Sequence, residues 1–248
     1  MALEDATKTI QVLLGAGKEY VCVMKLHADI PEVRVKEVLE EFQGKIYQKP
    51  PVRASVKRRV RVRKVYYVDV LEVDTRNVLF RVGCEAGTYI RKLCHDVGEV
   101  LGCGAHMHEL RRTRSGPFTE TENNITLHDV AYLHSKWRET NDISVLRRFV
   151  LPMEKTLGLL PKIHVRDSAV DALCHGAHLT APGVTSLETG IVKGSKVAIY
   201  TMKGEAISLA AATASTEEIF EKNHGIVARN IRVLMPRGTY PKLWRTKQ

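Results

Sequence analysis

Long apolar segments, paired cysteines and internal repeats are all missing from this 248-residue sequence. No run of eighteen apolar residues occurs, and the first twenty residues lack the basic-then-apolar order of a secretory signal. The five cysteines are odd in number and include no Cys-x-x-Cys pair, which argues against a disulfide framework and fits a reducing compartment. These absences predict a soluble, intracellular protein of the cytoplasm with no membrane partner. The absence of repeats also excludes a solenoid.

Acidic residues are scarce relative to basic ones. The sequence has 38 Lys and Arg against 28 Asp and Glu, a formal net charge of +10. Residues 49–64, called here the basic segment, contain no acidic residue and eight basic ones: Lys49, Arg53, Lys57, Arg58, Arg59, Arg61, Arg63 and Lys64. The rest of the chain is close to neutral. The localised charge predicts contact with a polyanion such as nucleic acid, and a solvated charged face is the alternative.

The hydrophobic pattern predicts two domains. Periodicity predicts helices over residues 2–14, 31–42, 88–101, 125–137 and 143–150, and strands over residues 20–26, 65–73 and 78–83. Beyond Pro161, short segments rich in Val, Ile and Ala alternate with glycines, which is typical of a small, mostly-β domain with one helix over residues 167–175. We therefore expect an α+β protein, with a mixed α/β domain over residues 1–160 and a mostly-β domain over residues 161–240.

Valine and arginine alternate within the basic segment. In an extended chain, this spacing points Arg59, Arg61 and Arg63 to one side and Val60 and Val62 to the other. A helix is the poorer interpretation, because β-branched residues disfavour it and unpaired cations on one helix face repel one another. We expect a ribbon that follows a phosphate backbone.

Two patterns that suggest phosphate or metal binding do not fit those sites. Residues 15–18, Gly-Ala-Gly-Lys, follow a predicted helix instead of a strand and lack the spacing of a phosphate-binding loop. Five soft ligands lie close together in the chain: Cys94, His95, Cys103, His106 and His108. Their spacing matches no zinc hairpin, and Cys94 lies on the apolar stripe of its helix. No metal site is predicted.

The strongest constellation consists of two short stretches. Residues 85–91 read Glu-Ala-Gly-Thr-Tyr-Ile-Arg, in which a Gly-Thr turn precedes a helix start that Thr88 can cap, and residues 110–116 read Leu-Arg-Arg-Thr-Arg-Ser-Gly. A helix start close to several guanidinium groups can hold an anion or orient a carboxylate. From spacing alone, the alternative is that Arg91 is a surface residue of an amphipathic helix.

At these residues the sequence resembles the TruB family of RNA pseudouridine synthases, and more closely the dyskerin branch with its archaeal members. The resemblance rests on residues 87–91, 110–112 and 116, and it extends over residues 16–20, 50–58, 105–112, 162–176 and 240–244. It runs from about residue 3 to about residue 244, far beyond a single motif.

The resemblance implies a pseudouridine synthase catalytic domain, N-terminally incomplete, followed by a PUA domain. The implied reaction is the H/ACA RNA-guided isomerisation of uridine to pseudouridine in ribosomal RNA and in tRNA. The uridine is flipped out, its glycosidic bond is broken, and the base is rejoined through a ring carbon. No cofactor is needed in the family. The implied partners are guide RNA, substrate RNA and the small accessory proteins of the H/ACA particle.

Family roles carry over to the matching residues. Tyr20 matches the tyrosine that stacks on the flipped base, and Leu110 matches an apolar wall of the pocket. Arg91 matches the arginine that pairs with the catalytic aspartate and keeps it ionised. The basic segment corresponds to the thumb loop that closes on RNA, and Arg111 and Arg112 complete the expected RNA-binding set. The last domain corresponds to the part that grips the guide RNA.

The sequence departs from the family at the nucleophile. The catalytic aspartate of the family lies in a Gly-x-Leu-Asp-Pro motif, which the 248 residues do not contain. Asp5 and Asp29 lie in other contexts and do not match it. We therefore expect the chain to bind RNA without isomerising uridine alone. The alternatives are a non-catalytic RNA-binding scaffold and a stand-alone tRNA pseudouridine synthase.

Overall fold

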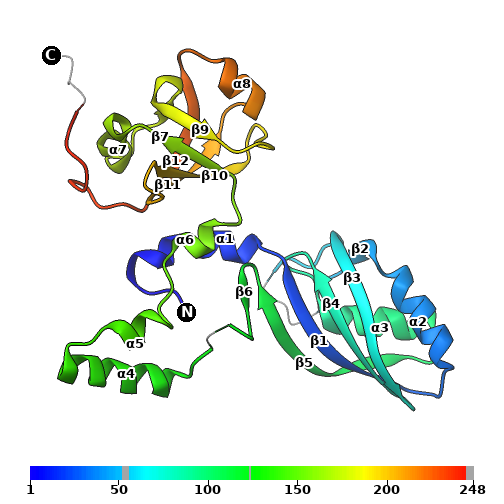
Figure 1. The fold of residues 1–248 in the computed structure, drawn as a ribbon. Coiled ribbons are helices and arrows are strands. Elements are labelled where there is room, and N and C mark those ends of the chain that lie inside the picture. Colours follow the sequence, from blue (N-terminus) through cyan, green and yellow to red (C-terminus); the bar gives the residue numbers. More distant parts are fainter. Residues whose placement is uncertain (52–55, 123, 244–248) are drawn as a thin grey trace. The chain divides into compact units, whose positions relative to one another are not determined.

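The structure is a computed structural model that describes residues 1–51, 56–122 and 124–243. The chain divides into two compact units (Figure 1). Leu13–Val150 form the first, called here the sheet unit, and Met1–Val12 with Leu151–Gln248 form the second, called the C-terminal unit. The first twelve residues thus group with the C-terminal unit. The predicted domains over residues 1–160 and 161–240 stay a prediction.

One antiparallel sheet organises the sheet unit, with strand order β2-β3-β4-β1-β5-β6. Its strands are β1 (Lys18–Leu26), β2 (Gly44–Gln48), β3 (Arg61–Asp74), β4 (Asn77–Cys84), β5 (Ala105–Ser115) and β6 (Phe118–Thr119). Strands β2, β3 and β4 are sequential neighbours in the sheet, and β1 inserts between β4 and β5. This order places the first strand of the unit in the middle of the sheet.

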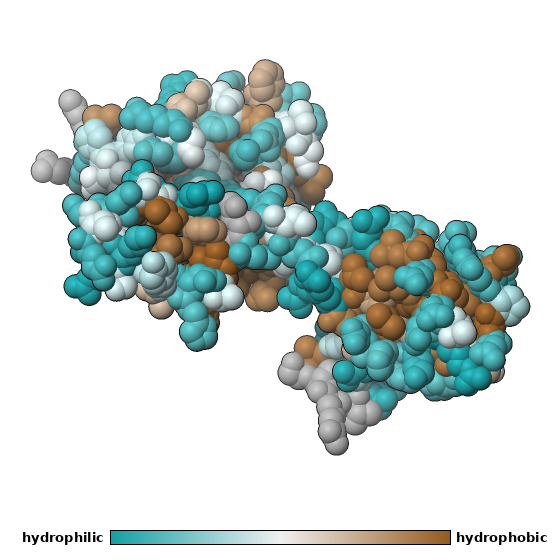
Figure 2. Space-filling view, turned by 60° about the horizontal axis from the view of Figure 1, so that its bottom comes forward, coloured by the Kyte–Doolittle hydropathy of each residue, from teal (hydrophilic) through white to brown (hydrophobic). Residues whose placement is uncertain are grey.

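Helices α2 (Glu32–Glu41) and α3 (Ile90–Val100) cover one face of this sheet (Figure 1). Alternate residues of β1 point to that face and are fully buried, and they pack against the apolar stripe of α3. These buried residues are Cys22, Met24 and Leu26 of β1 and Leu93, Cys94 and Val97 of α3. The alternate strand residues, such as Val21, Val23 and Leu71, remain partly or fully exposed, and Figure 2 shows apolar residues gathered on the surface of this unit.

Two further helices complete the sheet unit. Helix α4 (Leu127–Thr140) begins at Thr126, which forms a reciprocal capping box with Asp129. It ends at Asn141 in the left-handed conformation, with φ of 56°. Helix α5 (Ser144–Arg147) follows it. No residue of either helix is buried, so this part of the chain adds little to the core.

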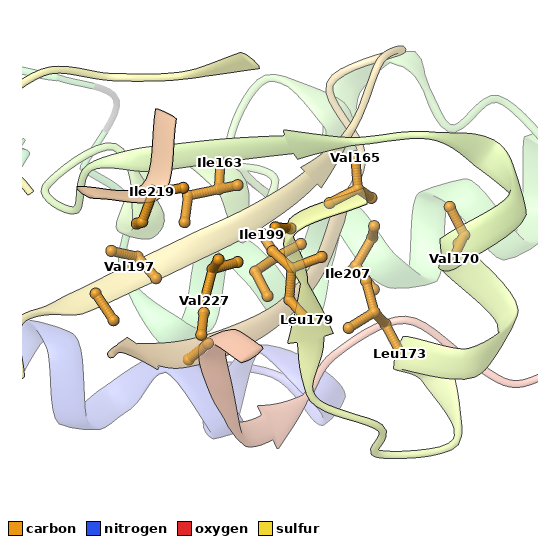
Figure 3. Close-up of a cluster of buried hydrophobic side chains, with 14 of the residues drawn as sticks. Ile163, Val165, Val170, Leu173, Leu179, Val197, Ile199, Ile207, Ile219 and Val227 are labelled. Carbon is orange, nitrogen blue, oxygen red and sulfur yellow. The ribbon is translucent and has the colours of Figure 1, made fainter. Parts of the chain in front are cut away.

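The C-terminal unit contains a second six-stranded sheet of order β8-β12-β11-β10-β7-β9. Its elements are α6 (Glu154–Leu157), β7 (Lys162–Val165), α7 (Asp167–Cys174), β8 (Leu179–Thr180), η2 (Ala181–Gly183), β9 (Val184–Leu187), β10 (Lys196–Thr201), β11 (Ala206–Ala212), α8 (Thr216–Glu221) and β12 (Ile226–Val233). Figure 3 shows its core of Val, Ile and Leu side chains between the strands and α7. Val12 and Leu157 share a smaller cluster with Leu234.

The N-terminal helix predicted over residues 2–14 forms as η1 (Glu4–Thr9) and α1 (Ile10–Gly15). The other predicted helices and strands also form, with shifted ends. The sequence patterns do not predict β2, β5 and α8. In β5, Ala105, Met107 and Leu110 point to the helix-covered face, but a bulge at His108 interrupts their two-residue spacing, so the sequence shows no regular apolar alternation.

The predicted cap of α3 at Thr88 is wrong by one residue. Tyr89 is the N-cap, and the Thr88 hydroxyl donates to Glu85 O instead. Among the described residues, no helix is long and apolar enough to cross a membrane.

Candidate functional site

Strand register places three predicted site residues on one face of the sheet. Tyr20 pairs with Arg112, and Cys22 pairs with Leu110, so Tyr20, Leu110 and Arg112 point to the face that α3 covers. A bulge at Thr113 lies just beyond Arg112, so it does not change the faces to which Leu110 and Arg112 point. The three side chains therefore lie together near the start of β1.

An aromatic ring, a guanidinium group and an apolar side chain meet at this point. The guanidinium carbon of Arg112 lies 5.4 Å from the centroid of the Tyr20 ring, which is a cation–π distance. Leu110 is 41% exposed although it is apolar, and it extends beyond the helix-covered core. Such a surface can take a flat, partly polar group that stacks on the ring and meets a fixed positive charge.

The first turn of α3 lies at the same end of the sheet. The His27 N–H donates to Gly104 O at 3.0 Å, and the Gly104 N–H donates to Gly98 O at 2.9 Å, so the C-terminal end of α3 lies by the end of β1. Midway, Cys22 Sγ and Cys94 Sγ are 3.6 Å apart. The opposite end of the helix, which carries Arg91, therefore lies toward Tyr20.

Arg91 is exposed on the first turn of α3. Within the described part of the chain, no carboxylate lies within ion-pairing distance of its guanidinium group. The neighbouring pairs on this helix, Lys92 with Asp96 and His95 with Glu99, leave Arg91 outside them. The predicted role of Arg91 toward a catalytic aspartate stays a prediction.

Lys18 fixes the start of β1. Its Nζ donates to the carbonyl oxygens of Leu13 and Leu14 at 3.0 Å each and of Ala16 at 2.7 Å. These carbonyls end α1, so one ammonium group caps the helix and anchors the strand that carries Tyr20. Burial lowers the pKa of Lys18, and the nearby Arg112 lowers it further.

A polar network holds the strands from the opposite face. Glu19 accepts hydrogen bonds from Thr113 Oγ1 at 2.6 Å and from the Tyr67 hydroxyl, and Arg114 Nη2 donates to the Tyr67 oxygen at 3.1 Å. The bonds from Thr113 and Tyr67 lower the pKa of Glu19, while burial and the bond to Glu19 raise the pKa of Tyr67. The network joins β1, β3 and β5 directly beside Tyr20.

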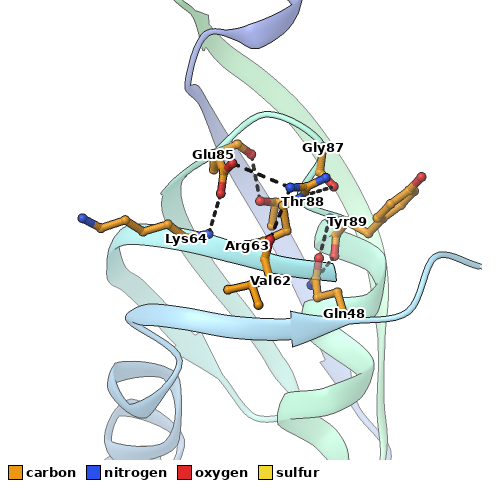
Figure 4. Close-up of polar contacts among 8 residues, drawn as sticks. All are labelled: Gln48, Val62, Arg63, Lys64, Glu85, Gly87, Thr88 and Tyr89. Carbon is orange, nitrogen blue, oxygen red and sulfur yellow. Dashed lines mark hydrogen bonds and ion pairs between the residues drawn. The ribbon is translucent and has the colours of Figure 1, made fainter. Parts of the chain in front are cut away.

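A loop that joins β4 to α3 is held by Arg63 and Glu85 (Figure 4). Arg63 Nε donates to Gly87 O at 3.3 Å, and Arg63 Nη1 lies 3.6 Å from Glu85 Oε1. The Lys64 N–H donates to Glu85 Oε2 at 3.0 Å. Gly87 has φ of 82°, and a Cβ there would lie 3.3 Å from Arg63 Nε, so this position requires glycine. Arg63 thus supports the loop that leads to Arg91.

The predicted RNA-binding residues of the basic segment fall into two groups. Lys49, Lys57 and Arg59 are exposed, as is Arg58, which also donates to Pro50 O at 3.4 Å; Arg53 lies outside the described residues. Arg61 and Arg63 lie on β3 in register with Gln48 and Ile46, on the helix-covered face. Val62 alternates with them and is 46% exposed.

Arg111 differs from its neighbour Arg112. It pairs with Val21, which places it on the face opposite Tyr20. There its Nε lies 2.7 Å from Glu120 Oε2 in an ion pair at the exposed surface. The structure therefore separates two residues that the sequence grouped as one cluster.

The cysteine and histidine residues do not form a metal centre among the described residues, where no group of three or more His, Cys, Asp or Glu side chains is placed to hold a metal ion. Cys22, Cys84 and Cys94 are buried, and burial raises the pKa of the Cys84 thiol to about 11. His27 and His106 share a hydrogen bond of 2.9 Å between ring nitrogens.

Three family profiles match the chain. Residues 91–158 match "tRNA pseudouridylate synthase B C-terminal domain", residues 161–234 match "PUA domain", and residues 4–103 match "Pus10, C-terminal". A "Probable tRNA pseudouridine synthase B" of Methanopyrus kandleri is 57% identical over all of this chain and 73% of its own length. A protein of the same name from Pyrococcus abyssi is 54% identical over 98% of this chain and 73% of its own length.

The chain belongs to the TruB-type RNA pseudouridine synthases, in the archaeal, dyskerin-type branch. Two solved structures agree with this assignment. "Crystal Structure of a Cbf5-Nop10-Gar1 Complex" matches with a TM-score of 0.93 and 52% identity over 96% of this chain and 73% of that one. "Structure of H/ACA RNP bound to a substrate RNA containing 2'-deoxyuridine" matches with a TM-score of 0.90 and 50% identity over 98% of this chain and 73% of that one.

Membership of this synthase family confirms the predicted fold class, a mixed α/β part of a pseudouridine synthase domain followed by a PUA domain. It also makes the chain a member of an isomerase family. Gln48, Glu85 and Lys18 were not among the predicted site residues of the synthase. Their sequence signals are weak, because a buried amide or a carbonyl-binding lysine is recognised only when its partners are known.

Proposed function

We propose that this chain acts in the RNA-guided isomerisation of uridine to pseudouridine, in ribosomal RNA and in tRNA. The observation that supports the proposal best is the placement of Tyr20, Leu110 and Arg112 on one face, beside the first turn of α3. The relatives named above, which include a substrate-bound H/ACA particle, point the same way. Guide RNA, substrate RNA and the accessory proteins of such a particle are the proposed partners.

In this proposal the flipped uridine stacks on Tyr20 against Leu110. The bond from the ribose to ring nitrogen N1 breaks and a bond from the ribose to ring carbon C5 forms. The C5 proton leaves and N1 is protonated, so atoms and electrons balance without an oxidant or a reductant. Arg91 orients and keeps ionised the aspartate that starts the reaction. The exposed cations of the basic segment hold the RNA backbone.

The 248 residues do not supply the nucleophilic aspartate, because they contain no Gly-x-Leu-Asp-Pro motif. We propose that the chain binds guide-paired substrate RNA and does not turn it over alone. The test measures binding and tritium release from C5 of a target uridine in the same sample. Binding without release is expected. Release by the chain alone would contradict the proposed need for that aspartate.

A matched pair of variants tests the site. Tyr20→Ala removes the stacking ring, while Tyr132→Ala removes a tyrosine that is exposed on α4. The first is expected to weaken binding of RNA with an unpaired target uridine by about 1–3 kcal/mol, as for other base–aromatic stacks, and the second to leave it unchanged. Equal affinity for the two variants would remove Tyr20 from the proposal.

A non-catalytic scaffold is the second candidate, and the absent motif favours it. The part of the Methanopyrus kandleri relative that this chain does not match, added in trans, distinguishes the two. Restored tritium release indicates that the chain is part of a working synthase. No tritium release, together with intact RNA binding, indicates a scaffold. A stand-alone tRNA enzyme would instead prefer an isolated tRNA to a guide–substrate pair.

A further inference from the structure

Gln48 is a buried amide that the site described above does not use. It is the last residue of β2 and is 2% exposed. Its Nε2 donates to Tyr89 O at 3.1 Å, and its Oε1 accepts from the Tyr89 N–H at 2.9 Å (Figure 4). Both halves of the amide are thus satisfied by the main chain of one residue, which fixes that residue in two directions.

Tyr89 is the N-cap of α3 and has no capping hydrogen bond from its own side chain. The first turn begins there, since the N–H groups of Lys92 and Leu93 donate to Tyr89 O at 3.1 and 3.0 Å. Gln48 therefore holds the residue that sets the direction of the helix, and Arg91 follows two positions later. Loss of this clamp frees the first turn without removing any core residue.

Gln48 also stands at the base of the basic segment. Lys49 follows it directly, and Arg61, the first residue of β3, is its register partner across the sheet. Arg61 Nε is buried and has no hydrogen-bond partner among the described residues. A buried donor without a partner is costly, so a shift of the Arg61 side chain that brings its guanidinium group to an RNA phosphate relieves that cost.

We propose that Gln48 is a positioning residue that couples RNA held by the basic segment to the first turn of α3, and hence to Arg91. The inference rests on the proposed function. RNA bound at Arg61 restricts the motion of the last residue of β2 and the first residue of β3. Through its two hydrogen bonds, Gln48 then restricts the motion of the Tyr89 main chain. RNA thereby restricts the first turn of α3, and with it the guanidinium of Arg91, more than the Gln48 clamp does in the free chain.

Amide hydrogen exchange of residues 88–93 tests this coupling in the full chain, with and without a synthetic H/ACA guide hairpin paired to its substrate strand. In the free chain, Gln48→Ala is expected to speed exchange of the Tyr89 amide by about tenfold, since a buried hydrogen-bonded pair is removed. The control is Gln43→Ala, at an exposed glutamine next to β2. It is expected to change nothing.

The change in amide exchange when RNA is added separates the proposed coupling from a purely structural role of Gln48, which would not alter that change. RNA is expected to slow exchange over residues 88–93 in the parent chain and in Gln43→Ala. Gln48→Ala is expected to bind RNA within about threefold of the parent, because its cations are intact, yet to show no slowing. Equal slowing in Gln48→Ala and the parent would overturn the coupling.

Gln48→Glu adds a pH-dependent rescue. The introduced carboxylate accepts from the Tyr89 N–H but donates nothing to Tyr89 O, so half of the clamp is missing at neutral pH. Burial favours the protonated form, which donates again. The exchange rate of the Tyr89 amide in Gln48→Glu, divided by the rate in the parent at the same pH, is therefore expected to fall towards one as the pH falls. A ratio that does not change with pH would contradict the clamp. A parent chain that fails to bind RNA would instead reject the proposed function, so the two failures are distinguishable.

Discussion

Two strands of this synthase, β3 and β5, are both rich in arginine, but their arginines point to different faces of the sheet. In β3, Arg61 and Arg63 alternate with Val62, and both arginines point to the face that carries Tyr20. In β5, the strand pleat sends Arg112 to that face and Arg111 to the other. The same residue type thus lines the site, supports a loop or forms a surface ion pair within one sheet.

In both strands, the partners of a cation decide its role, and the density of cations in the sequence does not. Arg63 is engaged by Gly87 and Glu85, and Arg111 by Glu120. Arg112 lies over the Tyr20 ring, and Arg61 Nε has no partner in the described part of the chain. Of these four arginines, Arg112 and Arg61 both point to the face of Tyr20 and are not held there by a carboxylate or a carbonyl group of the described residues.

The largest effect is expected from the exposed cations of the basic segment. The triple variant Lys57→Glu, Arg58→Glu, Arg59→Glu is expected to lower RNA affinity on the order of tenfold or more. The log–log salt slope is expected to fall by about 0.9 for each phosphate that the variant no longer neutralises. Titrations at several salt concentrations measure both. If affinity and slope stay unchanged, the segment is a solvated charged face.

Arg112 and Arg111 give a matched pair on neighbouring positions. Arg112→Ala is expected to weaken RNA binding by about 1 kcal/mol, because it removes the cation beside the Tyr20 ring. Arg111→Ala breaks an exposed ion pair and is expected to change binding and stability by less than about 0.5 kcal/mol. Similar effects of the two variants would show that strand face does not decide the role of these arginines.

Arg63 is expected to matter for stability more than for RNA. Arg63→Ala removes the hydrogen bond to Gly87 O and the ion pair with Glu85, and is expected to cost about 1 kcal/mol of unfolding free energy, measured in urea. Arg59→Ala is its control, since Arg59 is exposed and precedes β3. A reversed order of the two stabilities would place Arg63 among the free RNA-binding cations.

The smallest effect concerns the network on the opposite face. Because the pKa of Glu19 is lowered in the folded protein, its carboxylate stabilises the native state at neutral pH, and this contribution disappears as the pH falls below about 4. Glu19→Gln is expected to flatten that part of the pH–stability curve by a fraction of the parent change. Urea unfolding between about pH 3 and pH 7 spans this range. Parallel curves would contradict the assigned pKa direction.

Much of the fold was predictable because its elements have periodic apolar patterns. The stripe of Leu93, Cys94 and Val97 predicts α3 within a residue or two, and alternation predicts β1. The pattern fails at β5, where a bulge at His108 interrupts the spacing of the apolar residues, and at β2, whose five residues are too few for a period. The grouping of Tyr20 with Leu110 came from a family resemblance, since 90 positions separate them in the chain.

The sequence by itself determined the charge of the basic segment, the two-part organisation and the family, because composition, periodicity and motifs are properties of a linear chain. Only the tertiary structure decided which arginines face Tyr20, because the pairing and register of the strands set that choice. It alone decided that Gln48 holds Tyr89, since a buried amide finds its partner across 41 positions only after β2 and α3 have packed.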